Sequence, residues 1–83
     1  MKSENRIKEE LDNPLADEYS YSYTVGYKET LQWVLKEQAN EARVREALNG
    51  IYIEDECEKN YNWPFIEQAK GMRDALKWVL EGE

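Results

Sequence analysis

The 83-residue chain contains no histidine and a single cysteine. Without histidine it lacks the usual general base for a serine or cysteine nucleophile and the commonest zinc ligand. One cysteine forms no internal disulfide, which argues against a disulfide-stapled secreted scaffold. Cys57 lies among the carboxylates of Glu54–Glu58, and their charge disfavours the thiolate that a reactive cysteine needs.

Long apolar runs and an excess of basic charge are also missing. No stretch approaches the roughly 20 apolar residues of a membrane helix, and the charged start Met1–Leu11 is unlike a secretory signal, so we expect a cytoplasmic protein. The chain has 11 basic and 18 acidic side chains and a net charge of −7, which disfavours direct binding to nucleic acid or to an anionic membrane surface. No glycine-rich phosphate loop or calcium loop occurs, so we expect no metal and no cofactor.

Hydrophobic residues make up 41% of the chain, which is enough for the core of one small domain over residues 1–83. Within it, Gly26–Lys36 matches Gly71–Glu81, and glycine, leucine, tryptophan, valine and leucine recur in register. A weaker likeness joins Arg6–Leu11 to Arg43–Leu48 in the same order. The pattern predicts an internal repeat.

The repeat covers about residues 3–38 and 41–82, and each copy begins with a short element. Ser3 is a candidate cap for a helix over 4–11, which Asn13-Pro14 closes because the residue before proline avoids the α region. Asn40 is the equivalent cap for a helix over 41–48, with Asn49-Gly50 as its stop.

The long element of each copy follows helical spacing. In the second copy the apolar positions run from Phe65 to Leu80, with Asn62 as a cap, Pro64 in the first turn and Gly82 at the end. In the first copy they run from Tyr19 to Val34, with Asp17 as the cap candidate. Residues 19–25 also alternate as a strand would, and that alternative stays open at this point.

The sequence thus predicts an all-α fold of four helices in two repeated αα-hairpins, with the long helices antiparallel. Gly26 and Gly71 cost helix stability, so they indicate close packing. In an antiparallel pair, Trp33 would lie over Gly71 and Trp78 over Gly26.

For function, the aromatic and acidic residues after the third helix are the strongest feature. Tyrosine and tryptophan are favoured at the energetic centre of interfaces, and carboxylates suit a basic partner surface. The predicted partner-binding residues are Tyr21, Tyr52, Glu54, Asp55, Glu56, Glu58, Tyr61 and Trp63. The function that we predict is a non-enzymatic module that binds a basic, nucleic-acid-binding surface of another protein.

Small acidic helical proteins of this kind resemble products of phages or other mobile elements that inhibit host nucleic-acid machinery, a likeness of type rather than of family. The sequence leaves two alternatives open. One is a structural homodimerising bundle. The other is a small metal-dependent hydrolase, since helical bundles hold Mg²⁺ on paired carboxylates.

Overall fold

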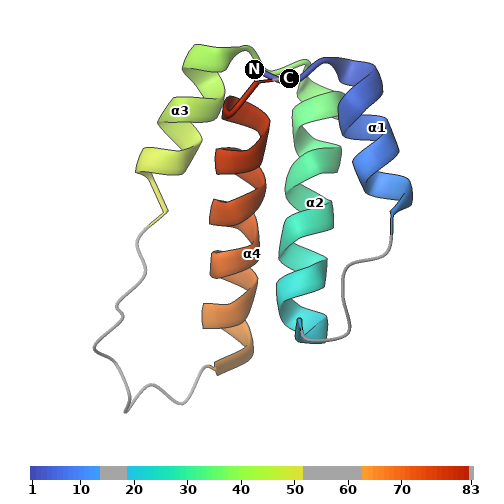
Figure 1. The fold of residues 1–83 in the computed structure, drawn as a ribbon. Coiled ribbons are helices and arrows are strands. Elements are labelled where there is room, and N and C mark those ends of the chain that lie inside the picture. Colours follow the sequence, from blue (N-terminus) through green and yellow to red (C-terminus); the bar gives the residue numbers. More distant parts are fainter. Residues whose placement is uncertain (14–18, 52–62, 83) are drawn as a thin grey trace.

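The computed structural model describes residues 1–13, 19–51 and 63–82, with the backbone alone at 63–65. The described residues form four α-helices and no strand (Figure 1), which confirms the all-α prediction. The helices are α1 (Glu4–Asp12), α2 (Tyr21–Glu37), α3 (Glu41–Asn49) and α4 (Trp63–Leu80). The strand alternative for residues 19–25 is wrong, because α2 begins inside that range.

Polar side chains fix where the first three helices begin. The side-chain oxygens of Ser3, Ser20 and Asn40 each accept a hydrogen bond from the backbone N–H three residues further on. Each bond satisfies one of the N–H groups that a helix start leaves without a partner. The predicted caps Ser3 and Asn40 are confirmed. The prediction that Asp17 caps the first long helix is wrong, because Ser20 lies directly before the first turn and its side chain accepts the capping hydrogen bond.

The two long helices run in the same direction, so the predicted antiparallel pair is wrong. Lys2 donates its backbone N–H to the carbonyl of Val79 near the end of α4, at 2.7 Å. Lys2 also lines a hollow with Leu35 and Gln38 at the end of α2. Both long helices therefore end on the same side of the molecule (Figure 1). Between them in the chain, α3 runs in the opposite direction to both long helices (Figure 1).

At Gly26 and Gly71 the backbones of α2 and α4 lie in close contact. A Cβ on Gly26 would overlap the backbone carbonyl of Gln68, and a Cβ on Gly71 would overlap that of Tyr23. Only glycine lets two helix backbones come this near. The glycines therefore set the distance between the long helices.

The predicted stacking of the tryptophans on these glycines is wrong, because backbone atoms already occupy that space. Trp33 and Trp78 lie instead at the edges of the helix pair, where both are half-buried. Each indole is covered by a cation from a short helix: the Arg43 guanidinium lies 5.6 Å from the ring centre of Trp33, and Arg6 lies 5.2 Å from that of Trp78.

The core runs along the α2–α4 pair. The short helix α1 packs on α2 and α3 packs on α4, as Figure 1 shows. Each short helix contributes one fully buried aliphatic residue, and each long helix contributes a leucine and a valine. These residues are Ile7, Leu31, Val34, Val44, Leu76 and Val79.

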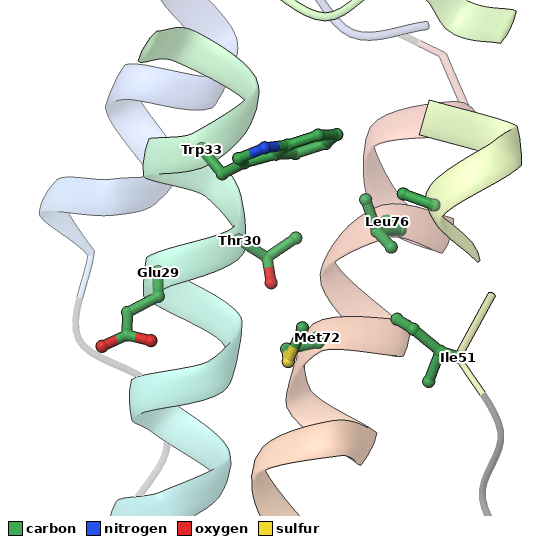
Figure 2. A pocket seen from close by; sticks show the side chains of 7 residues that line it. Glu29, Thr30, Trp33, Ile51, Met72 and Leu76 are labelled. Carbon is green, nitrogen blue, oxygen red and sulfur yellow. The ribbon is translucent and has the colours of Figure 1, made fainter. Parts of the chain in front are cut away.

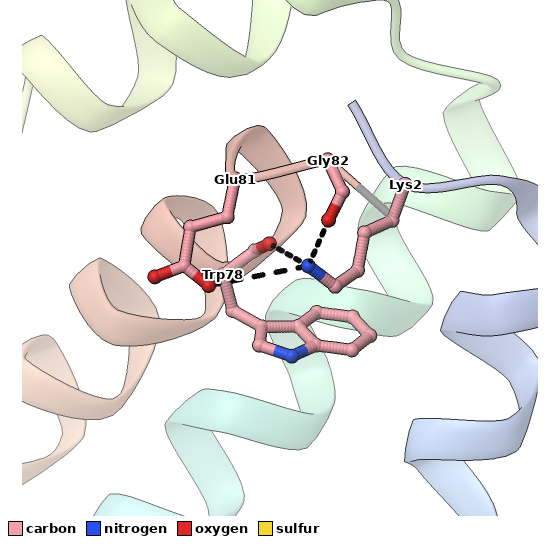
Figure 3. A network of polar contacts seen from close by, with 4 residues as sticks. All are labelled: Lys2, Trp78, Glu81 and Gly82. Atoms are coloured by element: carbon pink, nitrogen blue, oxygen red, sulfur yellow. Dashed lines mark hydrogen bonds and ion pairs between the residues drawn. The ribbon is translucent and has the colours of Figure 1, made fainter.

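The start of the chain closes the end of α4 (Figure 3). The Lys2 ammonium donates to the carbonyls of Trp78 at 2.9 Å and Gly82 at 2.7 Å. It also lies 4.5 Å from the Trp78 ring centre and 3.9 Å from the Glu81 carboxylate. A cation at this place satisfies carbonyls at the end of the helix and complements the negative end of its dipole.

Candidate binding site

Most of the predicted partner-binding residues cannot be placed. Outside the described residues lie Tyr52, Glu54, Asp55, Glu56, Glu58 and Tyr61. Trp63 begins α4, but its side chain is also outside the description. Tyr21, the first residue of α2, is 84% exposed. The acidic segment after α3 therefore stays a prediction, and only Tyr21 is shown on the surface.

The described helices form an open pocket of about 300 Å³ between α2, α3 and α4 (Figure 2). Its walls are mainly apolar. The residues that line it are Glu29, Thr30, Trp33, Ala47, Ile51, Met72 and Leu76.

Helical spacing brings these residues together. Thr30 and Trp33 are three positions apart on α2, and Met72 and Leu76 are four apart on α4, so each pair lies on one helix face. In Figure 2 the Trp33 indole reaches from α2 toward α4 across one end of the pocket. Met72 and Ile51 lie toward the other end. The pocket is thus an apolar hollow with an indole on one side and a thioether on the other.

Two charged groups flank the pocket. Arg43 covers the Trp33 ring and holds the indole by a cation–π contact. Glu29 lies at the edge of the pocket on α2, with its carboxylate turned away from Met72 (Figure 2). Its side chain is exposed, and within the described part of the chain it has no hydrogen-bond or ion-pair partner. This carboxylate is available to a ligand.

The side of the helix pair next to α1 is packed differently, and we call it the tyrosine face, after Tyr19, Tyr23 and Tyr27. Adjacent rings stack, with centres 4.6 Å apart for Tyr19 and Tyr23 and 6.3 Å apart for Tyr23 and Tyr27. The Tyr23 hydroxyl donates a hydrogen bond across to the carboxylate of Asp74 on α4.

Burial and nearby carboxylates favour the neutral form of the Tyr23 and Tyr27 phenols by raising their pKa. Burial is the main cause that raises the pKa of Tyr23 well above its ordinary value, and the hydrogen bond to Asp74 raises it further. Burial also raises the pKa of Tyr27, with added repulsion from Glu10 and Asp74. Tyr23 and Tyr27 therefore form a closed, neutral packing surface, and the open space lies on the α3 side.

A second hollow, of about 390 Å³, lies between the first residues of the chain and the end of α2. Its walls include the charged or polar side chains of Lys2, Glu4 and Gln38. Apolar walls with one or two polar groups are typical of ligand pockets, so the pocket at Trp33 is the better candidate although it is smaller.

The sequence did not point to this pocket. The sequence predicts a helix-packing role for Trp33 and no role for Glu29. A signal was present in the repeat, because its alignment sets Met72 against Tyr27. Where one copy has the ring of Tyr27 and the other has the flexible side chain of Met72, the space beside the helix pair is filled on the α1 side and left open on the α3 side.

Among the described residues, no three histidine, cysteine, aspartate or glutamate side chains are grouped so as to hold a metal ion. The helices in this part of the chain are also too short or too polar to span a membrane. The sequence matches no protein-family model, no curated protein and no solved structure. The interpretation of the pocket therefore rests on its own geometry and chemistry.

Proposed function

We propose that the protein is a non-enzymatic binding module that docks on a basic surface of a partner protein in the cytoplasm. The observation that carries this proposal is the open pocket: an apolar hollow beside Trp33, with the Glu29 carboxylate at its edge. An indole in a concave apolar site is typical of the anchor points of interfaces.

Charge supports a basic partner. The net charge is −7, so long-range attraction favours encounter with a positive surface and is screened by salt. In the sequence, the predicted acidic stretch Glu54–Glu58 begins three residues after Ile51, which lines the pocket. A nucleic-acid-binding protein offers such a surface, and inhibition of one, as in the phage products that this type resembles, is the role that we propose.

We also propose that the two halves are two copies of one hairpin. In support, each short helix covers the tryptophan of the other half: Arg6 lies over Trp78, and Arg43 over Trp33. Gly26 also lies against the carbonyl of Gln68, three residues before Gly71, and Gly71 lies against that of Tyr23, three residues before Gly26. Contacts that repeat in this crosswise manner are those of a two-fold pair.

The ends of the long helices support the same proposal. Ala39 donates its N–H to the carbonyl of Val34 at 3.0 Å, as Lys2 does to that of Val79 at 2.7 Å. Val34 and Val79 are matched positions of the repeat. The first residues of the chain therefore take, at the end of α4, the place that the α2–α3 connection takes at the end of α2.

Capture from the source cell tests the binding function, with Trp33→Ala compared with Trp78→Ala as the matched control. Both variants are checked by circular dichroism. We expect Trp33→Ala to lose a basic protein that Trp78→Ala retains, and capture to weaken between about 50 and 300 mM salt. Capture that ignores Trp33, or a captured set without basic surfaces, would contradict the proposal.

The alternative function, a homodimerising bundle, has one observation in its favour. Tyr21 is 84% exposed and Tyr19 is 42% exposed at the start of α2, and exposed aromatic side chains are favoured at interfaces. Light scattering over a concentration series decides this: a mass that doubles, and that Tyr21→Ser returns to the monomer value, would favour the homodimer.

A further inference from the structure

The tyrosine face shows what fits at the pocket, because the two are matched places of the repeat. With Gly26 set against Gly71, Tyr27 matches Met72 and Asp74 matches Glu29. The tyrosine face and the pocket therefore each lie against the α2–α4 pair, next to one short helix. At each of them, a tryptophan and a carboxylate come from matched positions of the repeat.

At the tyrosine face, the protein fills this place with phenol rings of its own. Tyr23 and Tyr27 are each only 8% exposed. The hydroxyl of Tyr23 crosses from α2 to the carboxylate of Asp74 on α4. Hydrogen bonds to an ionised acceptor are among the stronger ones in proteins.

At the pocket, the same positions carry side chains without rings. Met72 takes the place of Tyr27, Gln68 takes the place of Tyr23, and about 300 Å³ stays open. The carboxylate of Glu29, the match of Asp74, has no partner among the described residues. A ring and a hydroxyl are thus what the pocket lacks relative to its filled counterpart.

We propose that the pocket binds the side chain of a tyrosine from the partner protein, with the ring between Trp33 and Met72 and the hydroxyl donated to Glu29. Indole and thioether groups both make favourable contacts with an aromatic ring. The Glu29 side chain is exposed at the pocket edge, with its carboxylate turned away from Met72 (Figure 2), so this hydrogen bond requires a change of its rotamer. This inference rests on the proposed binding function and names the group that is recognised.

The full chain is titrated with the acetylated peptide Arg-Gly-Tyr-Gly-Arg, and binding is followed by NMR at the indole N–H groups. Trp33 reports on the pocket, and Trp78, its match next to the tyrosine face, serves as an internal control. We expect shifts at Trp33 and none at Trp78. The same peptide with phenylalanine in place of tyrosine should bind about tenfold more weakly, since it offers no donor to a charged acceptor.

Variants test each contact. Met72→Tyr places in the pocket the residue that fills the tyrosine face, so it should abolish the Trp33 shifts and leave the melting temperature unchanged or higher. Glu29→Gln should weaken binding of the tyrosine peptide about tenfold, to the level of the phenylalanine peptide. Glu37→Gln, at an exposed position near the end of the same helix, should leave binding as it is.

The following results would each overturn the inference. They are equal shifts at Trp33 and Trp78, equal affinity for the two peptides, and full binding by Met72→Tyr. Free p-cresol that binds as tightly as the peptide would also overturn it, since the site would then take small phenols rather than a partner's tyrosine. If a basic protein is captured through Trp33 while the peptide gives no shift, the inference fails and the proposed function stands. If the peptide binds and no basic protein is captured, the proposed function fails alone.

Discussion

The tyrosine face and the pocket are built on the same pair of helices and differ in what fills them. At both places a glycine holds the long helices close, and an arginine from a short helix covers a tryptophan. On one side Tyr23 and Tyr27 complete the packing, and on the other Met72 leaves a hollow. The scaffold is thus set by a few shared residues, and neighbouring positions are free to serve either packing or binding.

The largest effect is expected where the two halves are alike. Gly26→Ala and Gly71→Ala should each cost about 3 kcal/mol of unfolding free energy, because a methyl group there meets backbone that cannot give way. Urea denaturation measures both. Gly50→Ala is the control, since its Cβ would lie 3.5 Å from the nearest atom, the carbonyl oxygen of Ala47. If alanine at Gly26 or Gly71 lowers the unfolding free energy only slightly, the helices are not held by backbone contact.

The tyrosine face and the pocket should lose different amounts of unfolding free energy when a side chain is removed from each. Tyr27→Ala deletes a buried ring and should cost about 3 kcal/mol, whereas Met72→Ala deletes a half-buried side chain beside open space and should cost about 1 to 2 kcal/mol. The same denaturation experiment compares them. Equal losses of unfolding free energy would mean that Met72 is packed as tightly as Tyr27 and that the pocket closes in solution.

The junctions at the ends of the long helices should also differ, because Ala39 bonds through its backbone alone while Lys2 adds its ammonium. Lys2→Ala should cost about 1 to 2 kcal/mol, from the loss of the hydrogen bonds to Trp78 and Gly82. Lys77→Ala, at an exposed position, is the control and should change stability little. The contact with Glu81 adds little, because that carboxylate is 68% exposed.

The smallest effect is expected in alkaline solution. The folded state raises the pKa of Tyr23 and Tyr27, so the unfolded chain loses these protons first, near its ordinary pKa of 10.0. Stability from the two phenols is therefore complete below pH 10. It falls as the pH rises above 10, by about 1 kcal/mol per tyrosine for each pH unit. Melting temperatures across this range should fall less for Tyr27→Phe than for the natural chain. Tyr21→Phe, at an exposed position, should follow the natural chain, and a parallel change in all three would assign the loss to other groups.

Local features could be predicted from the sequence because their causes are local. The caps Ser3 and Asn40 act on the next turn of helix, and apolar spacing outlines the four helices. The direction of the long helices could not be predicted from their own residues, since it depends on how often the chain reverses between them.

The pocket was out of reach for a similar reason. The sequence predicts close packing at Gly26 and Gly71, but whether an indole or a backbone meets a glycine depends on the distance between the helices. That distance is a property of the whole pair. A hollow beside Trp33 follows only when the sizes of Tyr27 and Met72 are compared within this frame.

The bond from Lys2 to the carbonyl of Val79 has a consequence for synthesis. A growing chain produces Lys2 long before Val79, and Gly26 on α2 meets the backbone of α4 only after α4 has been made. Contacts between residues this far apart in the chain close late and slow folding. A nascent chain should therefore stay open to proteases until α4 has left the ribosome.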